Sequence, residues 1–232
     1  MKTIQWVLIY FSYTFIATGS PQAIDEMSHR TISELSALLD ASDADTRASA
    51  ATCIGMRYDD PAAVIIGSHY FHNPIPLQLP VPMGLLVKLD AMIDSDSNTV
   101  VKVSALEALG GICYRTNVSS LIAKHLSNRD FHIRLLSANK LIVISTRYGT
   151  ALPKETLPTL IAGLQPHNDS EEIWQSAYYL GEIHNGAESA IPVLEKVKKN
   201  KDKKVRMYVR EALAKIRKQV KNDTGTGTNS FK

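Results

Sequence analysis

Five stretches of the chain carry the same order of apolar, small and polar positions. Over ten residues, each has apolar or small side chains mainly at offsets 0, 4, 7 and 8, and four of the five have a basic residue at offset 1. The stretches are Thr46–Gly55, Val101–Gly110, Ile133–Ile142, Glu172–Gly181 and Val205–Ala214. Such a stripe is the buried face of an amphipathic helix. The pattern therefore predicts five helices of one kind.

A residue that can cap a helix stands three positions before each stretch. These residues are Asp43, Asn98, Asp130, Asp169 and Asp202. Asp and Asn side chains accept hydrogen bonds from the free backbone N–H groups of a first helical turn, so the five positions are predicted N-caps. The basic residues Arg47, Lys102, Arg134 and Arg206 follow their caps by four positions, which predicts that cap and cation share one side of the turn.

A second apolar helix is predicted before each of the five. The upstream segments are Ile32–Leu39, Met83–Ile93, Val118–Leu126, Leu157–Leu164 and Ile191–Val197. Starts of the repeated stretches lie 55, 32, 39 and 33 residues apart, and spacings in the thirties are typical of helical-hairpin solenoids. The longer first spacing contains a Pro-rich insertion at about residues 59–82. This insertion is predicted to be either a functional loop or a surface strap over an edge of the core.

The best-matching stretches, VKVSALEALGGI and VRMYVREALAKI, resemble HEAT repeats. The resemblance is to the short bacterial HEAT-like repeats that also occur in phycobilisome lyases, and it covers about residues 30–218. It implies an all-α fold, a right-handed α-solenoid of about five HEAT-like helical hairpins. The first helix of each hairpin would lie on the convex side, and the second would line a concave side that commonly binds another macromolecule. Chromophore or cofactor handling of the lyase kind is implied by the resemblance alone.

The N-terminus has the pattern of a secretory signal. Lys2 is followed by an apolar stretch from Ile4 to Ala17 and then by small residues, which predicts a signal peptide at 1–19 and an exported protein, periplasmic or secreted. The alternative is a buried N-terminal helix. The stretch is short for a permanent membrane anchor. The predicted organisation continues with the solenoid at 20–220 and a disordered tail at 221–232. After export, Cys53 and Cys113 could pair or remain two small buried thiols.

Charge is divided unevenly along the chain. Apolar residues make up 44% and charged residues 21%, which is typical of a globular protein, and the formal net charge is +3. Residues 1–195 contribute −7, from 13 basic and 20 acidic side chains, and residues 196–232 contribute +10, from 13 and 3. The basic end, residues 196–221, suits an acidic protein, nucleic acid or an anionic surface. It is also what a soluble outer face of a last repeat would carry. Its candidate contact residues are Lys199, Lys203, Lys204, Arg206 and Arg210.

An apolar column accompanies the predicted concave face. Offset 2 of the repeated stretches is occupied by Ala48, Val103, Leu135, Trp174 and Met207. Helical geometry points this offset away from the core stripe. With Tyr178 one turn beyond Trp174, the column predicts an apolar strip that binds a partner, since Trp and Tyr are frequent anchors. The alternative is that these side chains pack between adjacent second helices.

Enzymatic chemistry has little support in the sequence. His69 and His72 have neither the spacing of a helical zinc site nor a nearby Cys or acidic partner. The sequence also contains no G-x-S-x-G and no phosphate-binding glycine loop. No cofactor or metal is expected. The predicted function is an exported, non-enzymatic scaffold that binds a partner protein through its concave face and basic C-terminal unit. The alternative is nucleic-acid or anionic-surface binding through that unit.

Overall fold

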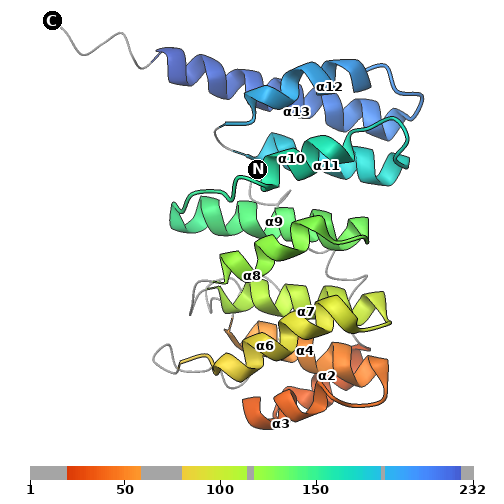
Figure 1. Cartoon of the computed structure of the whole chain (residues 1–232), viewed down its shortest axis with the longest axis vertical. Helices are drawn as coiled ribbons and strands as arrows, with labels where there is room; N and C mark the ends of the chain where they lie inside the picture. The colour runs from red at the N-terminus through yellow and green to blue at the C-terminus, as the bar shows by residue number, and fades with distance from the viewer. Residues whose placement is uncertain (1–19, 59–79, 114–117, 184–185, 226–232) are drawn as a thin grey trace, which may run out of the picture. The chain divides into compact units, whose positions relative to one another are not determined.

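The computed structural model describes residues 20–58, 80–113, 118–183 and 186–225 (Figure 1). Within these ranges the regular structure is helical and contains no strand. The chain divides into two compact units, residues 1–122 and 123–232, and each is described by itself. The predicted signal peptide at 1–19 lies outside the described residues. The same holds for positions 59–79 of the insertion and for both of its histidines, His69 and His72.

The five predicted second helices are present and begin two residues before their predicted stretches. They are α4 (Ala44–Tyr58), α7 (Thr99–Ile112), α9 (Phe131–Tyr148), α11 (Ser170–Glu182) and α13 (Lys203–Gly225), and α9 and α13 continue well past the predicted ends. All five predicted N-caps accept a backbone N–H in the first turn, with N···O distances between 2.6 and 3.1 Å. The predicted N-cap hydrogen bond is therefore confirmed in each of the five repeats.

The predicted first helices are present as well. They are α3 (Ile32–Leu38), α6 (Met83–Ser95), α8 (Ser119–Lys124) with the 3₁₀ turn η1 (His125–Ser127), α10 (Thr156–Gly163), and α12 (Ile191–Val197) after the 3₁₀ turn η2 (Glu188–Ala190). One further helix, α2 (Pro21–Met27), was not predicted. At the other end, α13 continues to Gly225, so positions 221–225 of the predicted tail are helical, and 226–232 lie outside the described residues.

Unit 1 is held together by the close packing of α4 on α7, with α2 and α3 on α4 and α6 on α7 (Figure 1). Two glycines set the distance between α4 and α7. A Cβ atom added to Gly111 would lie 2.5 Å from the carbonyl oxygen of Gly55, and one added to Gly55 would lie 2.8 Å from the Cα of Ala108. Because these are backbone atoms, no side-chain movement can make room, and the two helices require glycine there.

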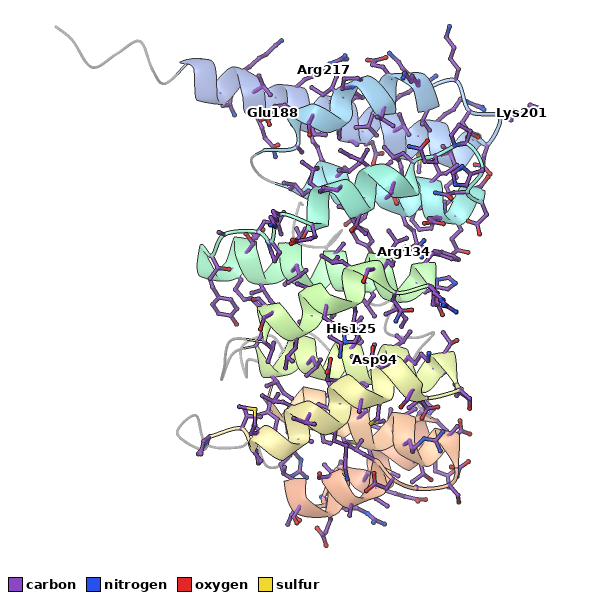
Figure 2. The ribbon with its side chains drawn as sticks, in the orientation of Figure 1. Asp94, His125, Arg134, Glu188, Lys201 and Arg217 are labelled. Carbon is purple, nitrogen blue, oxygen red and sulfur yellow. The ribbon has the colours of Figure 1, made fainter. Side chains whose placement is uncertain are left out.

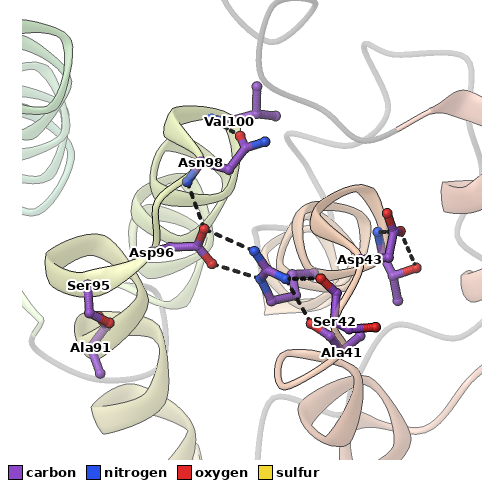
Figure 3. A network of polar contacts seen from close by, with 10 residues as sticks. Ala41, Ser42, Asp43, Ala91, Ser95, Asp96, Asn98 and Val100 are labelled. Atoms are coloured by element: carbon purple, nitrogen blue, oxygen red, sulfur yellow. Dashed lines mark hydrogen bonds and ion pairs between the residues drawn. The ribbon is translucent and has the colours of Figure 1, made fainter.

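A mostly buried ion pair also joins the first two hairpins of unit 1 (Figure 3). The guanidinium of Arg47 donates to both oxygens of Asp96, from Nε at 2.7 Å and from Nη2 at 3.0 Å. Its Nη1 donates to the carbonyls of Ala41 and Ser42. The Asp96 carboxylate also accepts the backbone N–H of Asn98 at 2.9 Å. Asp96 thereby fixes the turn between α6 and α7 while Arg47 closes the turn before α4.

The ion pair of Arg47 and Asp96 should make a contribution to stability that depends on pH. Burial alone would raise the pKa of Asp96, but the hydrogen bonds from Arg47 and Asn98 outweigh burial and hold that pKa below its usual value. A carboxyl with a lowered folded-state pKa stabilises the fold above its unfolded pKa, and the contribution is lost as the pH falls through the folded pKa. Asp96→Asn should therefore cost about 2 kcal/mol at neutral pH, measured by urea unfolding. Its difference from the wild type should shrink below about pH 4.

The matched control is Asp40→Asn. Asp40 is 69% exposed in its ion pair with Lys88, so the exchange should change the free energy of unfolding by less than about 0.5 kcal/mol. Equal effects of the two exchanges at neutral pH would contradict the role given to Asp96.

Unit 2 repeats the arrangement. α9, α11 and α13 follow one another as packed neighbours, while α10 lies against α9 and α11, and α12 lies against α13. Arg134 of α9, labelled in Figure 2, donates to Glu172 of α11 at 2.7 Å and so joins two successive hairpins as Arg47 and Asp96 do. At Gly181 of α11, an added Cβ would lie 3.0 Å from the Cα of Ala212 on α13, so α11 and α13 also approach closely.

Candidate binding surface on α11 and α13

Three aromatic side chains gather where α11 packs on α13. Trp174 and Tyr178 stand one turn apart on α11, and Tyr208 comes from α13. The rings of Trp174 and Tyr208 are stacked with centroids 4.9 Å apart, and Tyr178 meets Tyr208 edge to face at 5.8 Å. All three are half-buried. We call Trp174, Tyr178 and Tyr208 the aromatic cluster; its exposed ring surface is held in place by these mutual contacts.

Two lysines of α13 lie over these rings. The Nζ atom of Lys204 is 3.6 Å from the ring centroid of Trp174, and that of Lys215 is 5.6 Å from the centroid of Tyr178. Lys215 also forms an ion pair with Glu182 of α11. Burial raises the pKa of Tyr178 to about 12, with smaller contributions from Glu182, Tyr208 and Glu211. Tyr178 therefore keeps its hydroxyl proton at pH values where an ordinary tyrosine ionises.

The predicted apolar column does not form one exposed strip. Leu135 is 2% exposed and Ala48 is fully buried, so both belong to the cores of their units and the prediction of exposure is wrong for them. Val103 and Trp174 are half-buried, and Met207 is 46% exposed. The stacking of Trp174 on α13 gives the reason: offset 2 faces the neighbouring second helix. The alternative, in which the column packs between second helices, therefore applies to Trp174, whereas Met207 remains exposed.

Tyr208 was missed in the sequence. It stands at offset 3 of the last repeated stretch, and its only signal was its position one turn after Lys204, among residues that look like a basic helix face. The ring contact of Tyr208 with Trp174 joins positions 34 residues apart, which no local pattern reveals.

The basic residues of positions 196–221 include some that form ion pairs and others, among them the five predicted contact residues, that form none with a described carboxylate. Within the described part of the chain, no carboxylate lies within ion-pair distance of Lys199, Lys203, Lys204, Arg206 or Arg210. By contrast, Lys198 and Arg217, the latter labelled in Figure 2, both pair with Glu195, and Lys215 pairs with Glu182. Four of the five unpaired residues are exposed, and Arg206 is half-buried. Lys203, Arg206, Met207, Arg210 and Glu211 line an open hollow on α13.

Among the residues that the structure describes, the cysteines and the other titratable groups form no second site. Cys53 and Cys113 are free thiols; Cys53 is buried, as the alternative to pairing predicts, but Cys113 is only half-buried. Burial raises the pKa of Cys53 to about 11, and its thiol donates to the carbonyl of Ile24. Over the residues described, no group of three or more His, Cys, Asp or Glu side chains is placed to hold a metal ion. Among the same residues, no helix is long and apolar enough to cross a membrane.

Comparison with solved structures places this architecture among α-solenoids. A designed armadillo repeat protein in complex with the peptide (KR)4 is 17% identical, with a TM-score of 0.54, and the match covers 86% of this chain and 88% of that one. An engineered protein at 19% identity has a TM-score of 0.50 and coverages of 84% and 89%. Human deoxyhypusine hydroxylase in complex with glycerol is 17% identical, with a TM-score of 0.44 and coverages of 84% and 77%. No protein-family model and no curated protein sequence matches the chain.

The first two likenesses confirm the fold class, an all-α solenoid built from helical hairpins. At these identities the likeness shows the fold alone.

Proposed function

We propose that this protein is a non-enzymatic HEAT-like repeat scaffold that binds a partner protein through the second helices of unit 2. The observation that carries the proposal is the aromatic cluster, in which Trp174 stacks on Tyr208 under the ammonium group of Lys204. Trp, Tyr and Arg are the residues that most often dominate the free energy of protein binding. A fixed, partly exposed arrangement of these rings offers a partner apolar area at little cost in side-chain entropy.

The charge of the surface supports an acidic partner segment. The designed armadillo protein that matches this fold binds the basic peptide (KR)4. Here the side chains around the cluster are themselves basic, with Lys203, Lys204, Arg206 and Arg210 all on α13. Electrostatic complementarity therefore favours a partner that presents Asp and Glu beside apolar side chains.

Export is part of the proposal. The apolar stretch from Ile4 to Ala17 and the small residues after it support a signal peptide, and the protein would then act in the periplasm or outside the cell. The non-enzymatic assignment is supported by the lack of a nucleophile, phosphate-binding or metal motif in the sequence.

A second candidate is binding to nucleic acid or to an anionic surface. The five cations of the basic end that pair with no described carboxylate favour it, because phosphate groups bind such cations with little demand on geometry. This candidate predicts that binding falls steeply with rising salt concentration and is insensitive to the aromatic cluster.

Recovery of the protein from its own cells separates the two candidates. The full chain would carry a C-terminal tag, and the purified material would be treated with nuclease before co-purifying proteins are identified and the N-terminus is sequenced. A stoichiometric protein that survives nuclease treatment supports the scaffold, and an N-terminus near Ser20 supports export. Bound nucleic acid, detected by ultraviolet absorbance before the nuclease treatment, together with an intact Met1 would favour the second candidate.

A further inference from the structure

Three arginines occupy the same place in their hairpins and bind the chain in the same way. Arg47, Arg134 and Arg206 each stand four residues after the N-cap of a second helix. In each, Nη1 donates to two carbonyl oxygens of the preceding turn at 2.7–2.9 Å. The accepting residues are Ala41 and Ser42, Asn128 and Arg129, and Asn200 and Lys201. These contacts fix the position of each guanidinium group.

The three arginines differ in what the rest of the guanidinium group binds. Arg47 binds Asp96 through Nε and Nη2, and Arg134 binds Glu172 through Nη2 at 2.7 Å. In both cases the acid belongs to the next hairpin along the chain. Arg206 lies on α13, the last helix that the structure describes, and no described carboxylate comes within ion-pair distance of it. Its carboxylate-binding edge is therefore positioned but unoccupied by any described side chain.

The surface around Arg206 differs from the faces on which repeats stack. At offset 5 the earlier second helices carry Ala51, Leu106, Ala138 and Ala177, all fully buried. The equivalent residue of α13 is Arg210, which is exposed. An arginine there disfavours close packing of another helix of the same kind. Together with Lys203 and Met207, these residues form what we call the α13 end face: Lys203, Arg206, Met207 and Arg210, part of the hollow described above.

We infer that the α13 end face binds the acidic first turn of a helix in a partner protein, which places a carboxylate on Arg206 as Glu172 does on Arg134. Arginine can bind a carboxylate through paired donors, as Arg47 binds Asp96, and Arg134 binds Glu172 through a single donor. The exposed Met207 would contact an apolar side chain of the partner. The inference rests on the proposed function only in taking the partner to be a protein.

The test uses a peptide that carries this chemistry. A fluorescent probe, the acidic probe, would join residues 167–175, the capped start of α11, to an alanine-rich helical tail. A matched probe, the neutral probe, would carry Glu172→Gln. Binding to the full chain would be measured by anisotropy for the wild type, Arg206→Lys, Arg210→Ala and Lys196→Ala. Lys196 is an exposed lysine of α12, so its loss changes net charge without touching the α13 end face.

We expect Arg206→Lys to weaken binding of the acidic probe about tenfold, because lysine keeps the charge but loses the forked donor geometry. Arg210→Ala should weaken it by about threefold, Lys196→Ala should have little effect, and the neutral probe should bind the wild type about tenfold more weakly. Circular dichroism would confirm that each variant is folded. Equal losses for all three variants, or equal binding of the two probes, would overturn the inference. Tighter binding of a labelled DNA duplex than of the acidic probe would overturn it as well.

Failure here is distinguishable from failure of the scaffold proposal. If a protein co-purifies with the chain but these variants bind the acidic probe unchanged, the α13 end face is not the binding site of that protein. The aromatic cluster then remains the candidate site. If no protein co-purifies, the scaffold proposal fails whatever the peptide does.

Discussion

Replacing Gly111 by alanine should destabilise the protein by about 3 kcal/mol, the upper end of the cost of overpacking. The added methyl group would lie 2.5 Å from the carbonyl oxygen of Gly55, well inside van der Waals contact. Since that oxygen belongs to the backbone of α4, the clash can be removed only if α4 and α7 move apart. That movement would loosen the packing that holds unit 1 together. Urea unfolding followed by circular dichroism would measure the loss.

Gly84→Ala is the control for this exchange. Gly84 lies near the start of α6 with no other atom within 4 Å of an added Cβ, apart from its own chain neighbours and helix backbone. Alanine has the higher helix propensity, so this variant should gain about 0.5–1 kcal/mol. Similar stability changes in the two variants would show that α4 and α7 are not held at the distance described.

Trp174→Ala should weaken binding to the partner protein about 30-fold, the loss expected of a hot-spot residue. The exchange removes the ring on which Tyr208 stacks and the surface that Lys204 covers. It therefore eliminates both the anchor and the support of its neighbours. Isothermal titration with the protein identified by co-purification would give the affinity, with thermal unfolding as the check on folding.

Two further variants separate binding from folding. Met207→Asp changes a side chain that is 46% exposed, so the fold should tolerate it, while a carboxylate beside a basic surface should repel an acidic partner. Val87→Ala removes a more exposed apolar side chain from α6 and should leave the affinity unchanged. If Trp174→Ala and Met207→Asp both kept full affinity, unit 2 would not form the binding surface.

The helices could be predicted because their signals are local. Caps such as Asp43 and Asp202 act on N–H groups two or three residues away, and the apolar stripe repeats within a single helix. The spacing of the repeated stretches then indicated that each second helix follows a first helix in a hairpin. Most observed ends fall within about three residues of the predicted segments, the usual accuracy of such boundaries.

The surface could not be predicted to the same depth, because it depends on pairs of residues far apart in the chain. Leu135 and Trp174 share offset 2, yet the smaller Leu135 is covered while the larger Trp174 reaches the surface beside Tyr208. The pairing of Arg47 with Asp96 spans 49 residues and was invisible in a pattern that related Arg47 only to its own cap. Offset 2 stands at the same place in each second helix, but its exposure depends on what the neighbouring helix covers.

The claim that α11 and α13 form the partner-binding surface can be tested most directly by photo-cross-linking in the living cell. A photoreactive amino acid would replace Glu211, which is exposed on α13, or Lys196, which is exposed on α12. We predict a single stoichiometric cross-link to the co-purifying protein from position 211 and none from position 196. Cross-linking of that protein from position 196 with none from position 211 would contradict the account.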